Sequence, residues 1–156
     1  MVRRVITGNN AAGKSCIVSD EIVYDMTLWE SLPGLPLGIG TDGAPPAVLL
    51  TTAPGIEPPP GSSKCVFVSM KPWRIMKPEL ERGDFPGLDP DGFHRTATVD
   101  YIIVVSGEMT LALDEGKTIL RAGDLVVQRN TNHAWHNHTD EPVVFWGVLS
   151  SIEAAK

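Results

Sequence analysis

The chain has 156 residues, of which 42% are hydrophobic and 21% charged, and its formal net charge is −6 at pH 7. These values are typical of one soluble globular domain, which at this length buries about 70% of the surface of the unfolded chain. The acidic balance, with no basic cluster beyond Arg3 and Arg4, argues against a nucleic-acid-binding face. No apolar run approaches the ~20 residues that cross a bilayer, so we expect no membrane segment.

The N-terminus and the cysteines indicate a cytoplasmic protein. Residues 1–13 carry two positive charges but no apolar segment, so a secretory signal is not expected. Cys16 and Cys65 are too few for a disulfide framework, and we expect two reduced thiols.

The first residues predict two short strands, 2–7 and 15–18, joined by a turn-rich linker. The linker matches the phosphate-binding P-loop pattern GxxxxGKS, beginning at Gly8. A P-loop works only between a buried strand and a helix, whereas the residues after Ser15 are β-branched and predict a strand. We therefore interpret the match as a coincidence and expect no nucleotide.

Two proline-rich segments precede the most regular part of the chain. Residues 20–30 fit either a strand or a short helix. Residues 31–63 hold eight prolines and six glycines, so they predict a surface loop around one short strand at 47–51. The alternative is a binding or subunit-contact loop, since long ordered loops are often functional.

A strand is predicted next, at residues 64–70. Residues 71–92 then form the second connection, with one helical turn at 78–82, and end beside His94, where they could serve as a rim or lid. Its apolar side chains either cover a pocket or pack as satellites of the core; they are Trp73, Met76 and Phe85.

After Gly92 the pattern changes to closely spaced strands separated by Gly and Asp turns. Many short strands of even spacing indicate an all-β sandwich or barrel with very little helix. The predicted strands are 93–98, 101–106, 109–113, 117–121, 124–128, 133–137 and 142–150.

Strand periodicity places the chemically active residues on shared faces. His94, Thr96 and Thr98 share one face, which Asp100, Ile102 and Val104 continue. The opposite face, Val99, Tyr101, Ile103 and Val105, is also apolar, so the strand is expected to be buried on both sides. In a later strand His133, Trp135 and Asn137 share a face, and His136 and His138 lie on the other.

Two motifs in this region resemble those of the cupin superfamily. The first motif of that family has two histidines one residue apart, a glutamate four residues later and a glycine seven further on. This chain places there His94, Thr96, Asp100 and Gly107. The second motif has a Gly-Asp turn, a glycine, a histidine three residues later and an asparagine four beyond it. This chain places there Gly123-Asp124, Asn130, His133 and Asn137.

The resemblance covers about half the chain and implies a double-stranded β-helix, the jelly-roll barrel. We expect residues 1–156 to form a single domain. In it, residues 1–63 supply Pro/Gly-rich edge strands and loops, and residues 64–156 form the barrel core. Similar small cupins are commonly dimers, and the doubly apolar strand at 101–105 fits a homodimer.

The resemblance also implies a metal site, because metal-dependent cupins hold a divalent ion with three histidines and one glutamate. Carried over, the ligands are His94, Asp100 and His133, with Thr96 in place of a histidine. Two histidines and one carboxylate suit Fe(II) or Zn(II), and Mn(II) and Ni(II) are further candidates. The alternative is a metal-free pocket in which the histidines bond to Thr96, Thr98 or Asn137 and Asp100 caps a turn.

Further pocket residues follow from side-chain direction. Trp135 either forms a flat wall for an aromatic or polyene ligand or packs in the core. Gln128 is placed to bond a substrate carbonyl, whereas Arg129 is expected to be solvated. The predicted pocket residues are Thr96, Thr98, Gln128, Trp135 and Asn137.

Three functions remain open at this point. The first is a metal-dependent oxygenase, decarboxylase, cyclase or isomerase acting on a small organic or polyketide-like compound. The second is a metal-free enzyme in which His94 or His133 moves a proton next to a carbonyl, helped by Asp100. The third is a module that binds a small ligand without turnover.

Overall fold

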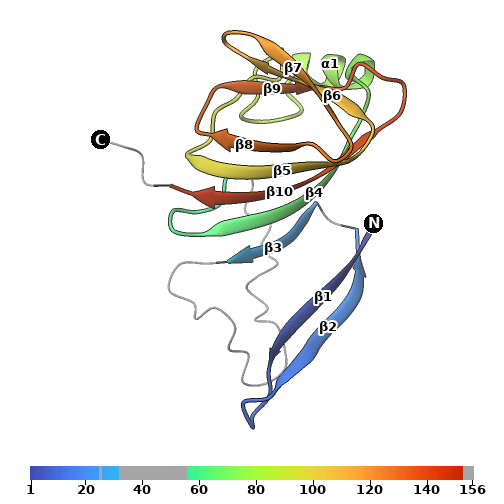
Figure 1. Ribbon diagram of the computed structural model, residues 1–156. Helices are drawn as coiled ribbons and strands as arrows, with labels where there is room; N and C mark the ends of the chain where they lie inside the picture. Colours follow the sequence, from blue (N-terminus) through green and yellow to red (C-terminus); the bar gives the residue numbers. More distant parts are fainter. Residues whose placement is uncertain (25, 32–55, 153–156) are drawn as a thin grey trace.

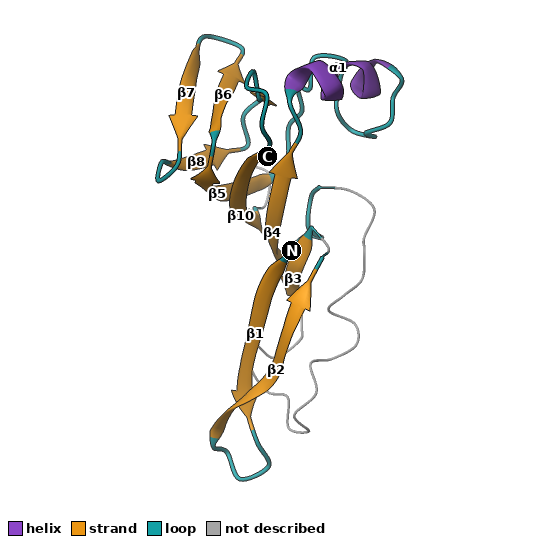
Figure 2. Ribbon diagram, turned by 90° about the vertical axis from the view of Figure 1, so that its right-hand side faces the viewer, coloured by secondary structure: helices purple, strands orange, loops and turns teal. Residues whose placement is uncertain are grey.

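The computed structural model describes residues 1–24, 26–31 and 56–152. In this part strands dominate and a single helix is present (Figure 2). The short strand predicted at 47–51 lies outside the described residues. The elements are β1 (Val2–Asn9), β2 (Ser15–Val23), β3 (Thr27–Ser31), β4 (Ser63–Met70), α1 (Trp73–Glu81), β5 (Thr98–Ser106), β6 (Glu108–Leu113), β7 (Lys117–Arg121), β8 (Leu125–Arg129), β9 (His133–His136) and β10 (Val143–Ser151).

Two antiparallel sheets lie one above the other and form the barrel (Figure 1). The large sheet has the order β3-β4-β10-β5-β8, and the small sheet has the order β7-β6-β9. Strands far apart in the sequence pair directly, as β10 does with both β4 and β5. The predicted all-β jelly-roll barrel is confirmed.

The core lies between the sheets because strand side chains alternate between the two faces. On β5, Ile102 and Val104 point inward and are 5% and 1% exposed, while their neighbours are not buried. On β10, Val143 and Phe145 do the same. The core cluster is completed by Met70, Met109, Leu111 and Leu120.

Gly147 of β10 leaves room for side chains from the two strands that pair with β10, namely β4 and β5. A Cβ atom at this position would lie 2.8 Å from Cδ1 of Ile102 and 3.1 Å from Cγ2 of Val66. The missing side chain therefore leaves the space that these residues of β5 and β4 fill.

Helix α1 begins five residues before the predicted turn at 78–82, which is a correction. The predicted turn started at Pro78, which instead lies inside the helix. Pro72 precedes the first residue of the helix, and its carbonyl accepts hydrogen bonds from the N–H groups of Ile75 and Met76. Met76 and Leu80, one turn apart, pack toward the interior.

In the described ranges no helix is long and apolar enough to span a membrane.

Strands β1 and β2 form an antiparallel hairpin that extends away from the barrel in both views (Figures 1 and 2). The two predicted strands are thus confirmed, although both are longer than expected. A strand follows the linker where a P-loop needs a helix. Of residues 20–30, which fitted a strand or a helix, residues 20–23 belong to β2 and residues 27–30 to β3, and the described residues between them lie in neither strand.

The strand predicted at 93–98 is wrong. Only an isolated bridge between His94 and His133 forms there, and β5 begins at Thr98 and runs unbroken to Ser106. Before β5 the backbone finds a side-chain partner, since the N–H of Ala97 donates to the carboxylate of Glu57 at 2.9 Å. The later predicted strands agree with β6 to β10 within about two residues at each end.

Candidate functional site

The two histidines predicted to face each other are brought together by the backbone. The N–H of each residue donates to the carbonyl of the other, both at 3.0 Å. Residues that exchange both bonds in an antiparallel pair project their side chains to the same side. The ring centroids of His94 and His133 accordingly lie 4.3 Å apart, tilted by 51°. His133 is buried and His94 is half-buried.

Both rings are held in the same way by carbonyl groups two residues earlier. Nδ1 of His94 lies 3.1 Å from the oxygen of Gly92, and Nδ1 of His133 lies 2.8 Å from that of Thr131. A carbonyl can only accept, so each Nδ1 carries the hydrogen. In the neutral rings both Nε2 atoms are therefore left with a free lone pair.

His133 is held neutral at ordinary pH. The pKa of His133 is lowered to about 4, chiefly by burial and to a smaller extent by the nearby His94, against the opposing effect of the hydrogen bond to Thr131. His133 therefore stays neutral near pH 7, with its hydrogen on Nδ1 and a lone pair on Nε2.

Asp100 lies on the same interior face, on β5, and is 4% exposed. Burial raises the pKa of Asp100, while the hydroxyl of Thr98 and the nearby His94 lower it, and Glu57 adds a small rise. Within the described part of the chain, the buried Oδ1 atom has no hydrogen-bond partner. A buried acceptor without a partner is costly, and such atoms are candidates for contact with a ligand.

The two threonines form a chain that ends at Asp100. The hydroxyl oxygens of Thr96 and Thr98 are 2.7 Å apart, and both side chains are buried. Since a hydroxyl has one hydrogen, Thr98 donates to the Asp100 carboxylate and accepts from Thr96. Threonine at position 96 thus supports the carboxylate.

Gln128 lies directly across from Asp100, on β8, and is 3% exposed. Its side-chain nitrogen donates to the hydroxyl of Thr131, the residue whose carbonyl holds His133. Gln128 therefore connects the turn before His133 to the neighbourhood of Asp100. Arg129 is exposed, as predicted.

Trp135 and Asn137 lie on the His133 side of their segment, whereas His136 and His138 lie on the other side, against Trp73. The centroid of the Trp135 ring lies 5.5 Å from the centroid of the His133 ring and 6.2 Å from that of the Phe145 ring. Trp135 therefore borders both the site and the core.

Asn137 fastens the turn after β9. Its amide nitrogen donates to the carbonyls of Met70 and Glu141, and its oxygen accepts from the N–H and hydroxyl of Thr139. All hydrogen-bonding groups of this side chain are engaged within the protein. The structure gives Asn137 a role in the fold, and its predicted contact with a ligand stays a prediction.

The backbone conformation explains the residue type at the two motif positions where the family has glycine, Gly107 and Asn130. Gly107 has φ +84°, and a Cβ atom there would lie 3.1 to 3.3 Å from atoms of Val143. Asn130, at the glycine position of the second motif, has φ 47°, the left-handed region that asparagine tolerates better than most residues.

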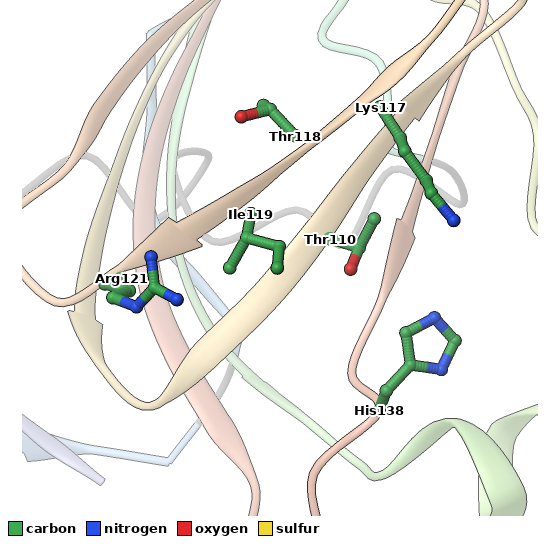
Figure 3. A pocket seen from close by; sticks show the side chains of 6 residues that line it. All are labelled: Thr110, Lys117, Thr118, Ile119, Arg121 and His138. Atoms are coloured by element: carbon green, nitrogen blue, oxygen red, sulfur yellow. The ribbon is translucent and has the colours of Figure 1, made fainter.

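Sequence reasoning missed Glu57, whose carboxylate binds the backbone before β5 and acts on the pKa of Asp100. Its place in a proline-rich segment gave no signal. A separate shallow pocket of about 630 Å³ was also missed (Figure 3). It involves the small sheet and the turn after β9, and its lining residues are Thr110, Lys117, Thr118, Ile119, Arg121 and His138.

The candidate ligands do not gather into a site that suits the predicted metal ion. In the described part of the chain no three His, Cys, Asp or Glu side chains are grouped closely enough to hold one. Two imidazoles present Nε2 atoms, but a metal site built from protein normally has at least three ligands. As arranged, the residues do not form the predicted three-ligand site of His94, Asp100 and His133, which stays a prediction.

Two similarities to known proteins identify the family of this chain. A cupin domain profile matches residues 81–150. Phomopsin biosynthesis cluster protein D of Diaporthe leptostromiformis is 33% identical over 97% of this chain and 78% of that protein. The chain belongs to the cupin superfamily.

Two further similarities are more local. The cupin-domain-containing oxidoreductase srdD of Neurospora crassa is 49% identical over 44% of this cupin and 37% of that protein. Among solved structures, a cupin 2 conserved barrel domain protein from Salinispora arenicola is 16% identical, covers 58% of this cupin and 62% of that chain, and has a TM-score of 0.38. Similarity to cupin-domain oxidoreductases and biosynthesis-cluster proteins supports an enzyme-like role on a small molecule.

Proposed function

We propose that this cupin is an enzyme of a biosynthetic pathway that moves a proton on a small organic carbonyl compound. The pathway context is supported by the relatives, which belong to the phomopsin and oryzines biosynthesis clusters. One observation carries the chemistry. Two imidazoles with free Nε2 atoms face each other on the same interior side as a buried carboxyl group whose pKa is raised.

The proposed step begins at His94, which is the less buried ring. Its Nε2 atom takes a proton from the carbon next to the substrate carbonyl, and the carboxyl group of Asp100, in the form that carries a proton, donates that proton to the carbonyl oxygen. The product is an enol, with His94 positively charged and Asp100 negatively charged. Return of both protons, the first to a different carbon or face, gives an isomer and restores the enzyme.

The other residues support this step in the proposal. Neutral His133, whose ring centroid lies 4.3 Å from that of His94, stabilises the positive charge that forms on His94 during the step. Thr98 donates to Asp100 and stabilises its charged form, and Thr96 orients Thr98. Trp135 supplies a flat apolar wall beside His133. No oxidant or reductant is needed, because only protons move.

The test is exchange of α-hydrogens for deuterium. Purified protein would be incubated in D₂O with a panel of small ketones and 1,3-diketones, including phenylacetone, and followed by proton NMR. General acid–base catalysis contributes about 10²–10⁴-fold, so His94→Ala is expected to lose roughly that factor. His138→Ala, at an exposed histidine outside the barrel, is the matched control and is expected to keep the wild-type rate. Exchange that His94→Ala leaves unchanged would contradict the proposal.

A second candidate is a metal-dependent enzyme. The fixed Nδ1–H groups favour it, because metal-bound histidines almost always donate the other ring N–H to a carbonyl or carboxylate. The oxidoreductase names of several relatives point the same way. A divalent ion here would need a further ligand, from Asp100 after a side-chain movement or from the substrate. Its chemistry would be that of a Lewis acid or oxygen activator.

Metal content separates the two candidates. Protein purified without a polyhistidine tag would be analysed for Fe, Mn, Ni and Zn, and the exchange assay repeated after chelation. The proton-transfer proposal expects unchanged exchange after chelation. Loss of exchange that one of these metals restores would favour the second candidate. Ligand binding seen by NMR without any turnover would favour a binding module.

A further inference from the structure

The inner face of the large sheet carries one row of residues that is mostly polar and fully buried. The opposite face of β5, which the sequence predicted to be buried as well, is open within one chain, with Tyr101 and Ile103 49% and 48% exposed. On the inner side, the pairing register places four residues side by side, and they are Lys64 of β4, Leu149 of β10, Asp100 of β5 and Gln128 of β8. Their exposed fractions are only 2–4%.

The adjacent row fixes the direction of these side chains. It contains Val66, Gly147 and Ile102, and a Cβ atom on Gly147 would lie within 3.1 Å of side-chain atoms of the other two. The side chains of this row therefore lie on the inner face, and residues two positions along each strand face the same way. Lys64 and Asp100 thus project from the same inner face. They are two strands apart, which is about 10 Å between their Cα atoms.

Lys64 is the one lysine or arginine that is buried in the described part of the chain. Lysine is rarely buried unless its charge has a partner, and Lys64 does take part in an interaction within the protein. An ammonium group has three N–H donors, so one such contact leaves donors for a ligand. The flexible four-carbon stem allows this group to reach across Leu149 toward Asp100.

Asp100 supplies the second half of the arrangement. Its Oδ1 atom is a buried acceptor that has no hydrogen-bond partner among the described residues. Such an atom indicates contact with a group that is not part of the chain. The row therefore holds a cation and an unsatisfied carboxyl group on the two sides of one apolar side chain, Leu149.

We propose that Lys64 binds a carboxylate of the substrate, and that the substrate is therefore an oxo acid. This inference rests on the function proposed above, in which Asp100 donates a proton to the carbonyl oxygen. With the carbonyl at Asp100, a carboxylate a few carbon atoms away lies over Leu149 and meets the ammonium group of Lys64.

The charge of Lys64 gives this contact its selectivity. A hydrogen bond between charged groups is stronger than one between neutral groups. It also offsets the repulsion between an anionic substrate and a chain whose net charge is −6. Lys64 thus determines which substrate binds, while the proton transfer itself stays with His94 and Asp100.

The test compares an oxo acid with its neutral ester. Wild-type protein in D₂O would be given levulinate or methyl levulinate, which contain the same ketone, and exchange of their α-hydrogens would be followed by proton NMR at several concentrations. A hydrogen bond to a charged group supports a preference of about tenfold or more in kcat/KM for levulinate. Lys64→Met is expected to reduce this preference to within about threefold by raising KM for levulinate, with kcat unchanged.

Two further variants sharpen the result. Lys117→Met, at an exposed lysine of β7, is the matched control and is expected to keep the wild-type preference. Lys64→Arg retains the positive charge and is expected to keep most of the preference, and circular dichroism checks that each variant folds. Full preference in a folded Lys64→Met overturns the proposal. A wild type that exchanges both compounds equally well overturns it without any variant.

Failure of the proposed function gives a different result. A wild type that exchanges neither compound contradicts proton transfer, and binding measured by NMR titration then decides the role of Lys64. Tighter binding of levulinate than of its ester, lost in Lys64→Met, supports the carboxylate site by itself. Equal binding of the two compounds, or binding of neither, overturns it.

Discussion

The inward face of β5 has two halves that are equally buried and chemically opposite. Thr98 and Asp100 are 0% and 4% exposed, and Ile102 and Val104 are 5% and 1% exposed. Burial of the apolar half stabilises the fold, whereas burial of polar groups costs free energy unless hydrogen bonds compensate it. In the polar half that compensation is incomplete, since Oδ1 of Asp100 has no partner in the described part of the chain. The apolar half of this face therefore contributes to the stability of the fold, and the polar half carries the candidate site.

The largest expected effect tests the apolar half. Met109→Ala removes a side chain that is 1% exposed in the core cluster and should lower the free energy of unfolding by about 2–5 kcal/mol. Met26→Ala, at a methionine that is 50% exposed, is the control and should change it by less than about 0.5 kcal/mol. Urea unfolding measures both. A loss below about 1 kcal/mol for Met109→Ala would remove the contrast between the halves.

The second effect comes from His133 in the polar half. The unfolded imidazole takes up its proton near pH 6.5, the folded one only near pH 4, so the unfolded state binds more protons in between. The stability that neutral His133 maintains at pH 7 is thus lost as the pH falls from about 6.5 to 4, by up to about 3 kcal/mol. Urea unfolding at several pH values should show a smaller loss in His133→Gln. The control His138→Gln should show the wild-type loss.

Asp100 should give a smaller effect of the opposite sign. Its folded pKa is raised above 3.8, so the unfolded carboxyl ionises first as the pH rises, and stability is lost from about pH 3.8 upward. In Asp100→Asn this loss is absent, so the variant should gain stability relative to wild type between pH 3.8 and pH 7. The exposed Asp140→Asn is the control. A constant difference over this pH range would mean that Asp100 does not titrate as described.

The smallest effect concerns the threonine chain. Thr98→Val keeps the shape but removes the hydroxyl that Thr96 and Asp100 share, so it should cost about 1 kcal/mol. The pKa of Asp100 should rise further because the donor to its charged form is gone. Carbon-13 NMR of the carboxyl group measures the pKa. Thr110→Val, on β6, should leave this pKa unchanged.

Much of the barrel could be predicted from the sequence, because Gly and Asp turns and period-two alternation are local signals. The same alternation placed Asp100 on one face with Ile102 and Val104, and this face is the buried one of β5. The motif spacing predicted that the two histidines meet, which their backbone bridge confirms.

Other features depend on tertiary partners and could not be read locally. Just before β5, the N–H of Ala97 donates to Glu57, forty residues earlier in the chain, and a local pattern cannot reveal this contact. Helix α1 starts at Trp73 and contains Pro78 in its interior, and its residues Met76 and Leu80 make tertiary contacts or are buried, which a local pattern does not reveal. The exposure of the outer face of β5 could not be predicted either, because an apolar pattern does not say what covers it.

The bridge between His94 and His133 has one more consequence. One ring belongs to a strand of the small sheet, while the other belongs to a segment outside any strand, joined to its partner by two reciprocal backbone bonds. Any displacement of residues 92–97 away from β9 breaks those bonds and separates the rings in the same motion. In the proposed reaction, the two imidazoles can therefore act together only while the backbone bridge between them is intact.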